Sequence, residues 1–146
     1  MLPAADVRPA QPALLTRGLL LVTAAAVVIG TGLLARRLPG FAGDAAGGLL
    51  YAVLVYLLLA LAALALSRRG GAVWLAGAAF TVCTLVELFQ LTPWPARLGE
   101  AWAPLHLVFG STFNAWDLAA YAAGATLAGA GDALLRRNPR SRLARS

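Results

Sequence analysis

Residues 45–66 read AAGGLLYAVLVYLLLALAALAL, an apolar run of 22 residues without a charge. A helix needs about 20 such residues to cross the hydrocarbon core of a bilayer, because each residue advances it by about 1.5 Å. Lipid offers no hydrogen bonds to the backbone, so a spanning segment is either a helix or a strand of a closed barrel. The run lacks the alternation of apolar and polar residues that barrel strands show. It therefore predicts a transmembrane helix.

Three further apolar runs of similar length occupy the rest of the chain. Turns that contain Pro or Gly separate them. The sequence is 60% hydrophobic and 12% charged, whereas soluble domains carry about 25% charged residues. We expect an all-α membrane protein with a single domain over residues 14–135. Its four transmembrane helices are predicted at about 18–35, 45–66, 72–92 and 116–135.

The remaining segments are two tails and one long connection. Residues 1–13 contain three prolines and predict a disordered tail, and residues 136–146 predict a basic tail. The connection over residues 93–115 carries Trp94 and Trp102, which are typical of the membrane interface. We therefore expect this connection to lie at the outer interface.

All twelve basic residues are arginines, and their distribution predicts the orientation of the chain. One side of the predicted bundle holds Arg8, Arg17, Arg68, Arg69, Arg136, Arg137, Arg140, Arg142 and Arg145, whereas the other holds Arg36, Arg37 and Arg97. The positive-inside rule places the richer side in the cytoplasm. We expect a multi-pass protein of the inner (cytoplasmic) cell membrane with both termini in the cytoplasm. The arginines are not interleaved with aromatic residues, so nucleic acid is not an expected partner.

Glu87 is the most informative residue in the predicted helices. It lies inside the run of residues 72–92, where an ionisable group normally faces protein or a water-filled cavity. Gln90 lies three residues later on the same helix face. Three roles stay open for Glu87: an acceptor that fixes helix packing, a group that binds a ligand or takes part in catalysis, and an assembly contact.

Asp117 opens the last run, with Tyr121 one turn further on the same face. A carboxylate there favours the helix dipole, so helix stabilisation and a place in a site both stay open, and Asn114 can cap this helix. Asp44 is expected to cap the second helix rather than to bind a ligand. The candidate polar site at the outer helix ends comprises Glu87, Gln90, Asp117, Tyr121, Asp44, Arg36, Arg37 and Arg97. On the last helix, Ala120, Gly124 and Ala128 form a small face for close packing.

No metal or cofactor is expected. The spacings HxxxH and ExxH do not occur, and the single cysteine, Cys83, cannot form an intrachain disulfide. The sequence also has no P-loop and no nucleophile elbow. The residues therefore specify no reaction class, and whether the chain is an enzyme stays open.

Several short segments together resemble a known family. They are Gly43-Asp44, Leu50-Tyr51-Ala52, Val55-Tyr56, residues 87–91, residues 109–113, residues 116–121 and Gly124. Over residues 14–130 the chain resembles a small bacterial membrane family known as domain of unknown function 2809. The Glu and Gln late in one helix and the Asp opening the next are also similar to VanZ-like proteins, in which an arginine, here Arg97, stands between them. The resemblance implies a helical membrane protein and no established reaction.

Three functions are compatible with these features. The first is an outer-face site for an anionic lipid head group or a lipid-linked cell-envelope intermediate, with arginines that pair with phosphate. The second is a non-enzymatic accessory or scaffold protein, which uses its polar groups to lock its helices and docks a membrane protein or a second copy. A small transporter is the least favoured, because no run is broken at mid-membrane.

Overall fold

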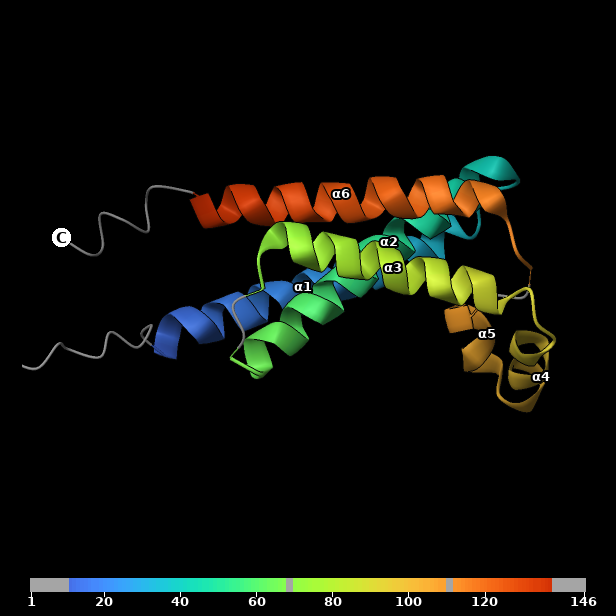
Figure 1. Ribbon diagram of the computed structural model, residues 1–146, viewed down its shortest axis with the longest axis horizontal. Coiled ribbons are helices and arrows are strands. Elements are labelled where there is room, and N and C mark those ends of the chain that lie inside the picture. The colour runs from blue at the N-terminus through green and yellow to red at the C-terminus, as the bar shows by residue number, and fades with distance from the viewer. Residues whose placement is uncertain (1–10, 68–69, 110–111, 138–146) are drawn as a thin grey trace, which may run out of the picture.

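The structure is a computed structural model that describes residues 11–67, 70–109 and 112–137 (Figure 1). Within these residues the chain forms helices and no strand. In chain order the helices are α1 (Gln11–Ala35), α2 (Phe41–Ala65), α3 (Ala72–Phe89), α4 (Trp94–Ala101), α5 (Ala103–Phe109) and α6 (Ala115–Arg137). The predicted all-α fold class is confirmed.

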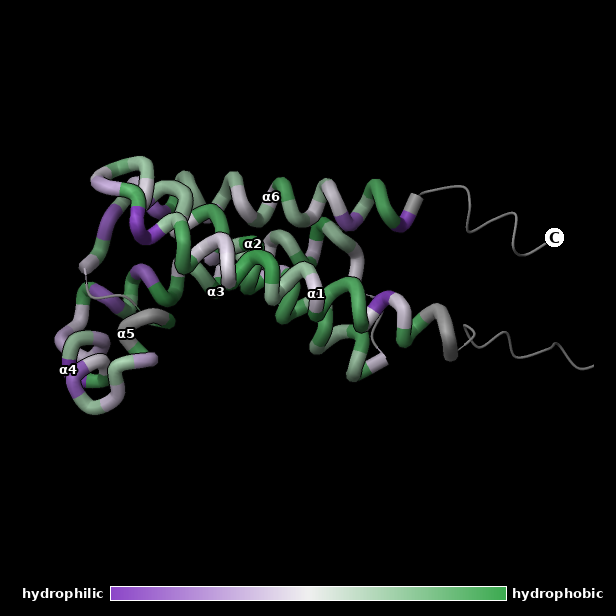
Figure 2. The backbone as a smooth tube through the Cα atoms, turned by 180° about the vertical axis from the view of Figure 1, so that it is seen from behind, coloured by the Kyte–Doolittle hydropathy of each residue, from purple (hydrophilic) through white to green (hydrophobic). Residues whose placement is uncertain are grey.

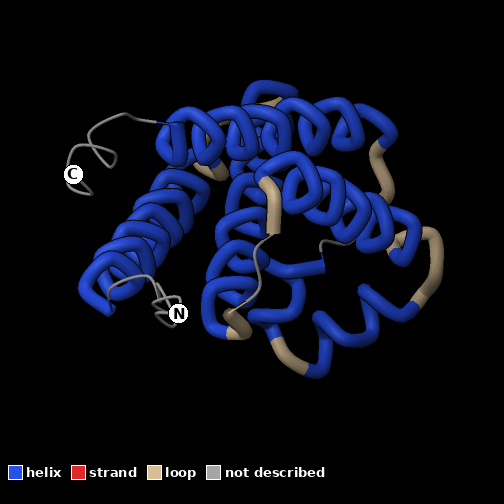
Figure 3. Tube along the Cα trace, turned by 60° about the vertical axis from the view of Figure 1, so that its left-hand side comes forward, coloured by secondary structure: helices blue, strands red, loops and turns tan. Residues whose placement is uncertain are grey.

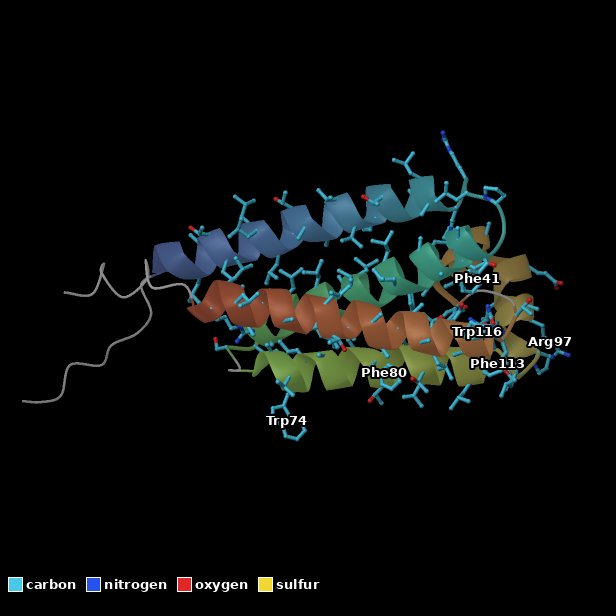
Figure 4. All side chains as sticks on the ribbon, turned by 90° about the horizontal axis from the view of Figure 1, so that it is seen from above. Phe41, Trp74, Phe80, Arg97, Phe113 and Trp116 are labelled. Atoms are coloured by element: carbon cyan, nitrogen blue, oxygen red, sulfur yellow. The ribbon has the colours of Figure 1, made fainter. Side chains whose placement is uncertain are left out.

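Among the described helices, four are long and apolar enough to cross a membrane. They are Leu14–Ala35, Phe41–Ala65, Ala72–Phe89 and Ala115–Arg136. Large apolar side chains stay exposed on their surfaces, and Trp74 of α3, which is 83% exposed, projects away from the bundle (Figure 4). Lipid accepts such a surface, whereas in water it would promote aggregation. The chain therefore has the build of a multi-pass membrane protein with four spanning helices, as predicted.

The two helices next to the termini are longer than predicted. α1 begins at Gln11 and α6 continues to Arg137, so residues 11–13 and 136–137 are helical rather than parts of tails. Pro12 lies in the first turn of α1, where a missing N–H removes no intrahelical hydrogen bond. The rest of both predicted tails, residues 1–10 and 138–146, lies outside the described residues.

α2 begins at Phe41, four residues before its predicted start, and the prediction that Asp44 caps this helix is wrong. The N-cap is Gly40, whose φ of 62° lies in the region that glycine reaches without a steric penalty. Asp44 lies instead in the first turn of α2. There its carboxylate interacts favourably with the positive end of the helix dipole.

α3 ends at Phe89, three residues earlier than predicted. The backbone N–H groups of Leu91 and Thr92 donate to the carbonyl groups of Leu88 and Phe89 at 3.1 and 3.0 Å. These bonds span three residues and tighten the chain beyond a regular α-helix. Pro93 follows, and its ring disfavours the helical conformation of the residue before it.

The long connection after α3 folds into two short helices, α4 and α5, which pack against each other beside one end of the bundle (Figures 1 and 3). We call this the loop end, and the opposite end, where residues 11 and 137 lie, the terminal end. Trp94 and Trp102 in this connection are 56% and 60% exposed. Figure 2 shows hydrophobic residues along the four long helices and many of the hydrophilic residues at the loop end.

Close packing in the bundle depends on small residues. α6 packs along α2, α3 lies against both, and α1 packs on α2. At the contact of α2 with α6, Ala120 lies opposite Gly48, and Gly124 faces the backbone of Leu49. Further along α6, Ala128 packs against the buried core. The predicted small face of α6 is therefore confirmed, and it brings the loop-end residues of α2, α3 and α6 together.

Candidate functional site

Glu87 is fully buried near the loop end of α3, with 0% of its surface exposed. The Tyr121 hydroxyl donates to its Oε2 at 2.8 Å, and the backbone N–H of Asn114 donates to its Oε1 at 2.5 Å. Each carboxylate oxygen thus has a partner from α6 or from the segment that leads into it. These bonds compensate the loss of water and join α3 to α6, so this geometry supports the packing role of Glu87.

Asn114 also organises the start of α6, as predicted. Its side-chain Oδ1 accepts a hydrogen bond from the Trp116 N–H at 3.2 Å, and its carbonyl accepts one from the Asp117 N–H at 2.9 Å. These contacts satisfy backbone donors that the first helical turn leaves open. Asn114 Nδ2 donates to Asp117 Oδ1 at 3.2 Å, which orients this carboxylate.

Beside these residues lies a cavity of about 900 Å³ at the loop end. Its walls come from α1, α2, α3, α6 and the segment around α5. The polar part of the lining comprises Arg36, Asp44, Tyr51, Gln90, Thr112, Asn114, Asp117 and Tyr121, and the apolar part includes Val28, Ile29, Leu33, Leu50, Leu54 and Val86. One cavity thus combines apolar walls with a group of polar side chains.

The structure gathers most of the predicted polar site around this cavity. Arg36, Asp44, Gln90, Asp117 and Tyr121 line it, and Glu87 lies behind the lining, where it holds Tyr121 and Asn114 in place. The two other arginines are not part of the lining.

Arg97 and Arg37 lie away from the cavity. Arg97 belongs to α4, where its guanidinium lies over the Trp94 ring at 5.7 Å, and it projects from the loop end (Figure 4). Arg37 is exposed in the turn after α1. Adjacent residues at a helix end point in different directions, so Arg36 and Arg37 do not share a face. The expected pairing of all three arginines with one ligand therefore has no support in this geometry.

The side chain of Gln90 makes a hydrogen bond through its amide nitrogen. Its Nε2 donates to the Phe109 carbonyl at 2.6 Å, which joins α3 to α5. Its Oε1 is buried and has no hydrogen-bond partner among the described residues. The same is true of the nearby Thr84 Oγ1. Buried acceptors without a partner are costly. Because Gln90 Oε1 has almost no accessible surface, it does not face the cavity.

Tyr51 was not among the predicted site residues, although it lines the cavity. Its ring lies 6.1 Å from that of Tyr121. The signal in the sequence is its position seven residues, or about two turns, after Asp44, which places both on one face of α2.

A second polar cluster, around Asp132, lies toward the terminal end. Asp132 Oδ1 pairs with Arg17 of α1 at 3.2 Å, and Oδ2 accepts from the Tyr56 hydroxyl of α2 at 2.7 Å. Arg136 donates to Oδ2 from Nε at 2.9 Å and from Nη2 at 2.6 Å, and its Nη1 donates to the Gly70 carbonyl at 2.9 Å. This cluster ties α1 and α2 to α6. Only the spacing of four between Asp132 and Arg136 was visible in the sequence.

Asp132→Asn is expected to lower the free energy of unfolding by about 1.5–3 kcal/mol, the value of hydrogen bonds to a charged group. The amide cannot pair with Arg17 and Arg136 as the carboxylate does. Unfolding of the purified protein in detergent micelles, followed by circular dichroism, measures the change. Glu100→Gln is the matched control, because Glu100 is exposed on α4. Equal stability of the two variants would contradict this role.

The part of the chain that the structure describes contains no group of three metal-ligating side chains. Cys83 is buried and free, in the core cluster with Ala52 and Tyr121. At this position it packs as a small apolar residue.

Comparison with known proteins identifies the family. A family model described as a protein of unknown function (DUF2809) matches residues 37–125, well over half of the chain. The matched segment contains Asp44, Glu87, Gln90, Asp117 and Tyr121, whereas Arg36 and Asp132 lie outside it. No curated protein and no solved structure matches the chain significantly. The chain belongs to the DUF2809 family of proteins of unknown function.

Proposed function

We propose that the cavity at the loop end binds the head group and adjoining chain of a membrane lipid or of a lipid-linked cell-envelope intermediate. The observation that carries this proposal is the combination of apolar and polar walls in one cavity of about 900 Å³. Cavities of about 300–1,000 Å³ are typical of small-molecule sites. An amphiphile is the ligand class that satisfies both kinds of wall.

The lining offers different contacts to the parts of such a ligand. The Arg36 guanidinium is suited to a phosphate oxygen, because its planar group can donate two parallel hydrogen bonds. The Asp117 carboxylate accepts from hydroxyl, amide or amine groups. An acyl or prenyl chain lies along Val28, Leu33 and Leu54. In this proposal Glu87 does not touch the ligand and instead positions Tyr121 and Asn114.

We place the loop end on the outer face of the cytoplasmic membrane, with both termini in the cytoplasm. The distribution of arginine along the sequence supports this orientation under the positive-inside rule, because nine arginines belong to one side of the predicted bundle and three to the other. The exposed Trp94 and Trp102 at the loop end support an interfacial position for α4 and α5. The cavity then lies at the depth where head groups meet acyl chains.

Two neighbouring glycines of α1 provide the test. A Cβ atom at Gly30 or at Gly32 would meet nothing within 4 Å, so a side chain can begin at either position without a clash at its first atom. Gly32 lines the cavity and Gly30 does not. We expect Gly32→Trp to fill the cavity and to lose most of the lipid that co-purifies with the protein, whereas Gly30→Trp retains it. Native mass spectrometry of protein released from membranes measures the retained lipid.

Thermal unfolding in detergent must show that both variants are folded. If Gly32→Trp retains as much lipid as Gly30→Trp and the wild type, lipid binding in this cavity is excluded. If neither the wild type nor Gly30→Trp retains lipid, the proposal also fails.

A scaffold role is the second candidate. It is favoured by a shallow hollow of about 320 Å³ between α3 and α6, lined by small residues that include Ala76, Gly77 and Ala122. Small residues let helices approach closely in a membrane. A defined membrane partner that co-purifies with the wild type, together with unchanged lipid retention in Gly32→Trp, would favour this role over the lipid site.

A further inference from the structure

The hydrogen-bonding donors beside the cavity are largely used within the protein. Asn114 Nδ2 donates to Asp117, the Tyr121 hydroxyl donates to Glu87, and Gln90 Nε2 donates to the Phe109 carbonyl. These three donors are therefore not available to a ligand.

Two carboxylates of the cavity lining have open acceptors. Asp117 Oδ2 accepts no hydrogen bond from the described residues. Asp44, which is exposed in the lining, makes no hydrogen bond or ion pair within the described ranges. Carboxylates from α2 and α6 thus line one cavity, and both require donors from a ligand or from water.

The charges of the lining also favour a ligand with a donor group, and they favour one that is cationic. Asp117 lies within electrostatic range of both Asp44 and Glu87, whereas Arg36 is the one cationic side chain that lines the cavity among the described residues. Asp44 and Asp117 both lie in the first turns of their helices, α2 and α6. Next to apolar walls this excess of negative charge is weakly screened, and a cationic group on the ligand compensates it.

We propose that the lipid head group carries a primary ammonium group beside its phosphate. This inference rests on the proposed lipid site and names its substrate class. A primary ammonium supplies one positive charge and three N–H donors, which match the oxygens of the Asp44 and Asp117 carboxylates. The phosphate of the same head group then faces Arg36. A quaternary ammonium has the charge without the N–H donors, and a glycerol head group has hydroxyl donors without the charge.

The test is lipid competition in nanodiscs that contain the full-length protein. The nanodiscs hold equal amounts of phosphatidylethanolamine, phosphatidylcholine and phosphatidylglycerol with identical acyl chains, and native mass spectrometry counts the lipids that the protein retains after release. We expect phosphatidylethanolamine to be retained about tenfold more than phosphatidylcholine, the factor that about 1.4 kcal/mol of a charge-assisted hydrogen bond gives. Retention should fall stepwise with N-methyl and N,N-dimethyl phosphatidylethanolamine, because each methyl group replaces one N–H donor.

Variants that remove one negative charge test which carboxylates cause the preference for the primary amine. Asp44→Asn and Asp117→Asn are each expected to lose most of the preference for the amine. Asp44 is exposed and has no partner to lose, so its variant folds even if Asp117→Asn does not. Glu100→Gln removes the same charge on α4, outside the cavity lining, and should keep the full preference.

The outcomes separate this inference from the proposed function. Preferential retention of phosphatidylglycerol, equal retention of all three lipids, or unchanged selectivity in Asp44→Asn would overturn the ammonium assignment while lipid binding stands. If an equal concentration of soluble phosphoethanolamine displaced phosphatidylethanolamine, the ligand would be a soluble compound. The assignment to a lipid would then be overturned. Lipid retention that Gly32→Trp does not reduce would instead refute the cavity as a lipid site.

Discussion

Gly124→Val is expected to destabilise the protein by about 3 kcal/mol, the upper end of the usual cost of overpacking. A Cβ atom at Gly124 would overlap the Leu49 carbonyl oxygen and would lie 3.1 Å from the Ala52 Cβ. The overlap is with the backbone of α2, which cannot turn aside as a flexible side chain can. α2 and α6 must therefore separate, and their contact is central to the bundle.

Gly131→Val on the same helix is the matched control. A Cβ atom there would meet nothing within 4 Å, so this variant has the same change in helix propensity without the clash. Thermal unfolding in detergent, followed by circular dichroism, compares the two, and size-exclusion chromatography reports the yield of monodisperse protein. Equal melting temperatures for Gly124→Val and Gly131→Val would show that α2 and α6 do not approach as closely as described.

Glu87→Leu is expected to lower the free energy of unfolding by about 2–6 kcal/mol, because two buried donors that lose their acceptor cost about 1–3 kcal/mol each. The donors are the Tyr121 hydroxyl and the backbone N–H of Asn114. Glu87→Gln keeps one side-chain oxygen as an acceptor and should cost less. The start of α6, including Asp117, loosens in Glu87→Leu, so this variant should also lose lipid retention.

A double-mutant cycle tests the pairing directly. Tyr121→Phe removes one of the two donors, so Glu87→Leu should cost less in the Tyr121→Phe background than in the wild type. Chemical unfolding in detergent measures the four free energies. Strict additivity of the free energies would contradict the hydrogen bond from Tyr121 to Glu87. Equal losses of stability in Glu87→Leu and Glu87→Gln would show that the missing acceptor is not the cause of the loss.

Much of the candidate site could be predicted because the chain reverses direction with each spanning helix. This alternation places the end of α1, the start of α2, the end of α3 and the start of α6 at one end of the bundle. Polar residues at those four places must therefore lie at the same depth, as Arg36, Asp44, Gln90 and Asp117 do. The spacing of four between Asp117 and Tyr121 likewise placed both on one face of α6.

Position around a helix axis could not be predicted in the same way. Arg36 lines the cavity and its neighbour Arg37 does not, although both end the same run. Arg97 lies over Trp94 because the connection forms α4, and the apolar loop sequence did not predict that helix. The bond between Tyr56 and Asp132 joins residues 76 positions apart, and no local pattern indicates which helices face each other.

The run at residues 45–66 thus determined, together with its three counterparts, that the chain is an all-α protein with four spanning helices. The reason is that lipid forms no hydrogen bonds with the backbone, so an apolar run of this length must satisfy its N–H and C=O groups within its own helix. Only the tertiary structure decided what the polar residues do. Burial and hydrogen bonds from Tyr121 and Asn114 make Glu87 a packing residue, whereas the carboxylates of Asp44 and Asp117 line the cavity. That difference depends on which groups the folded helices bring within hydrogen-bonding distance, and it has no counterpart in the local sequence.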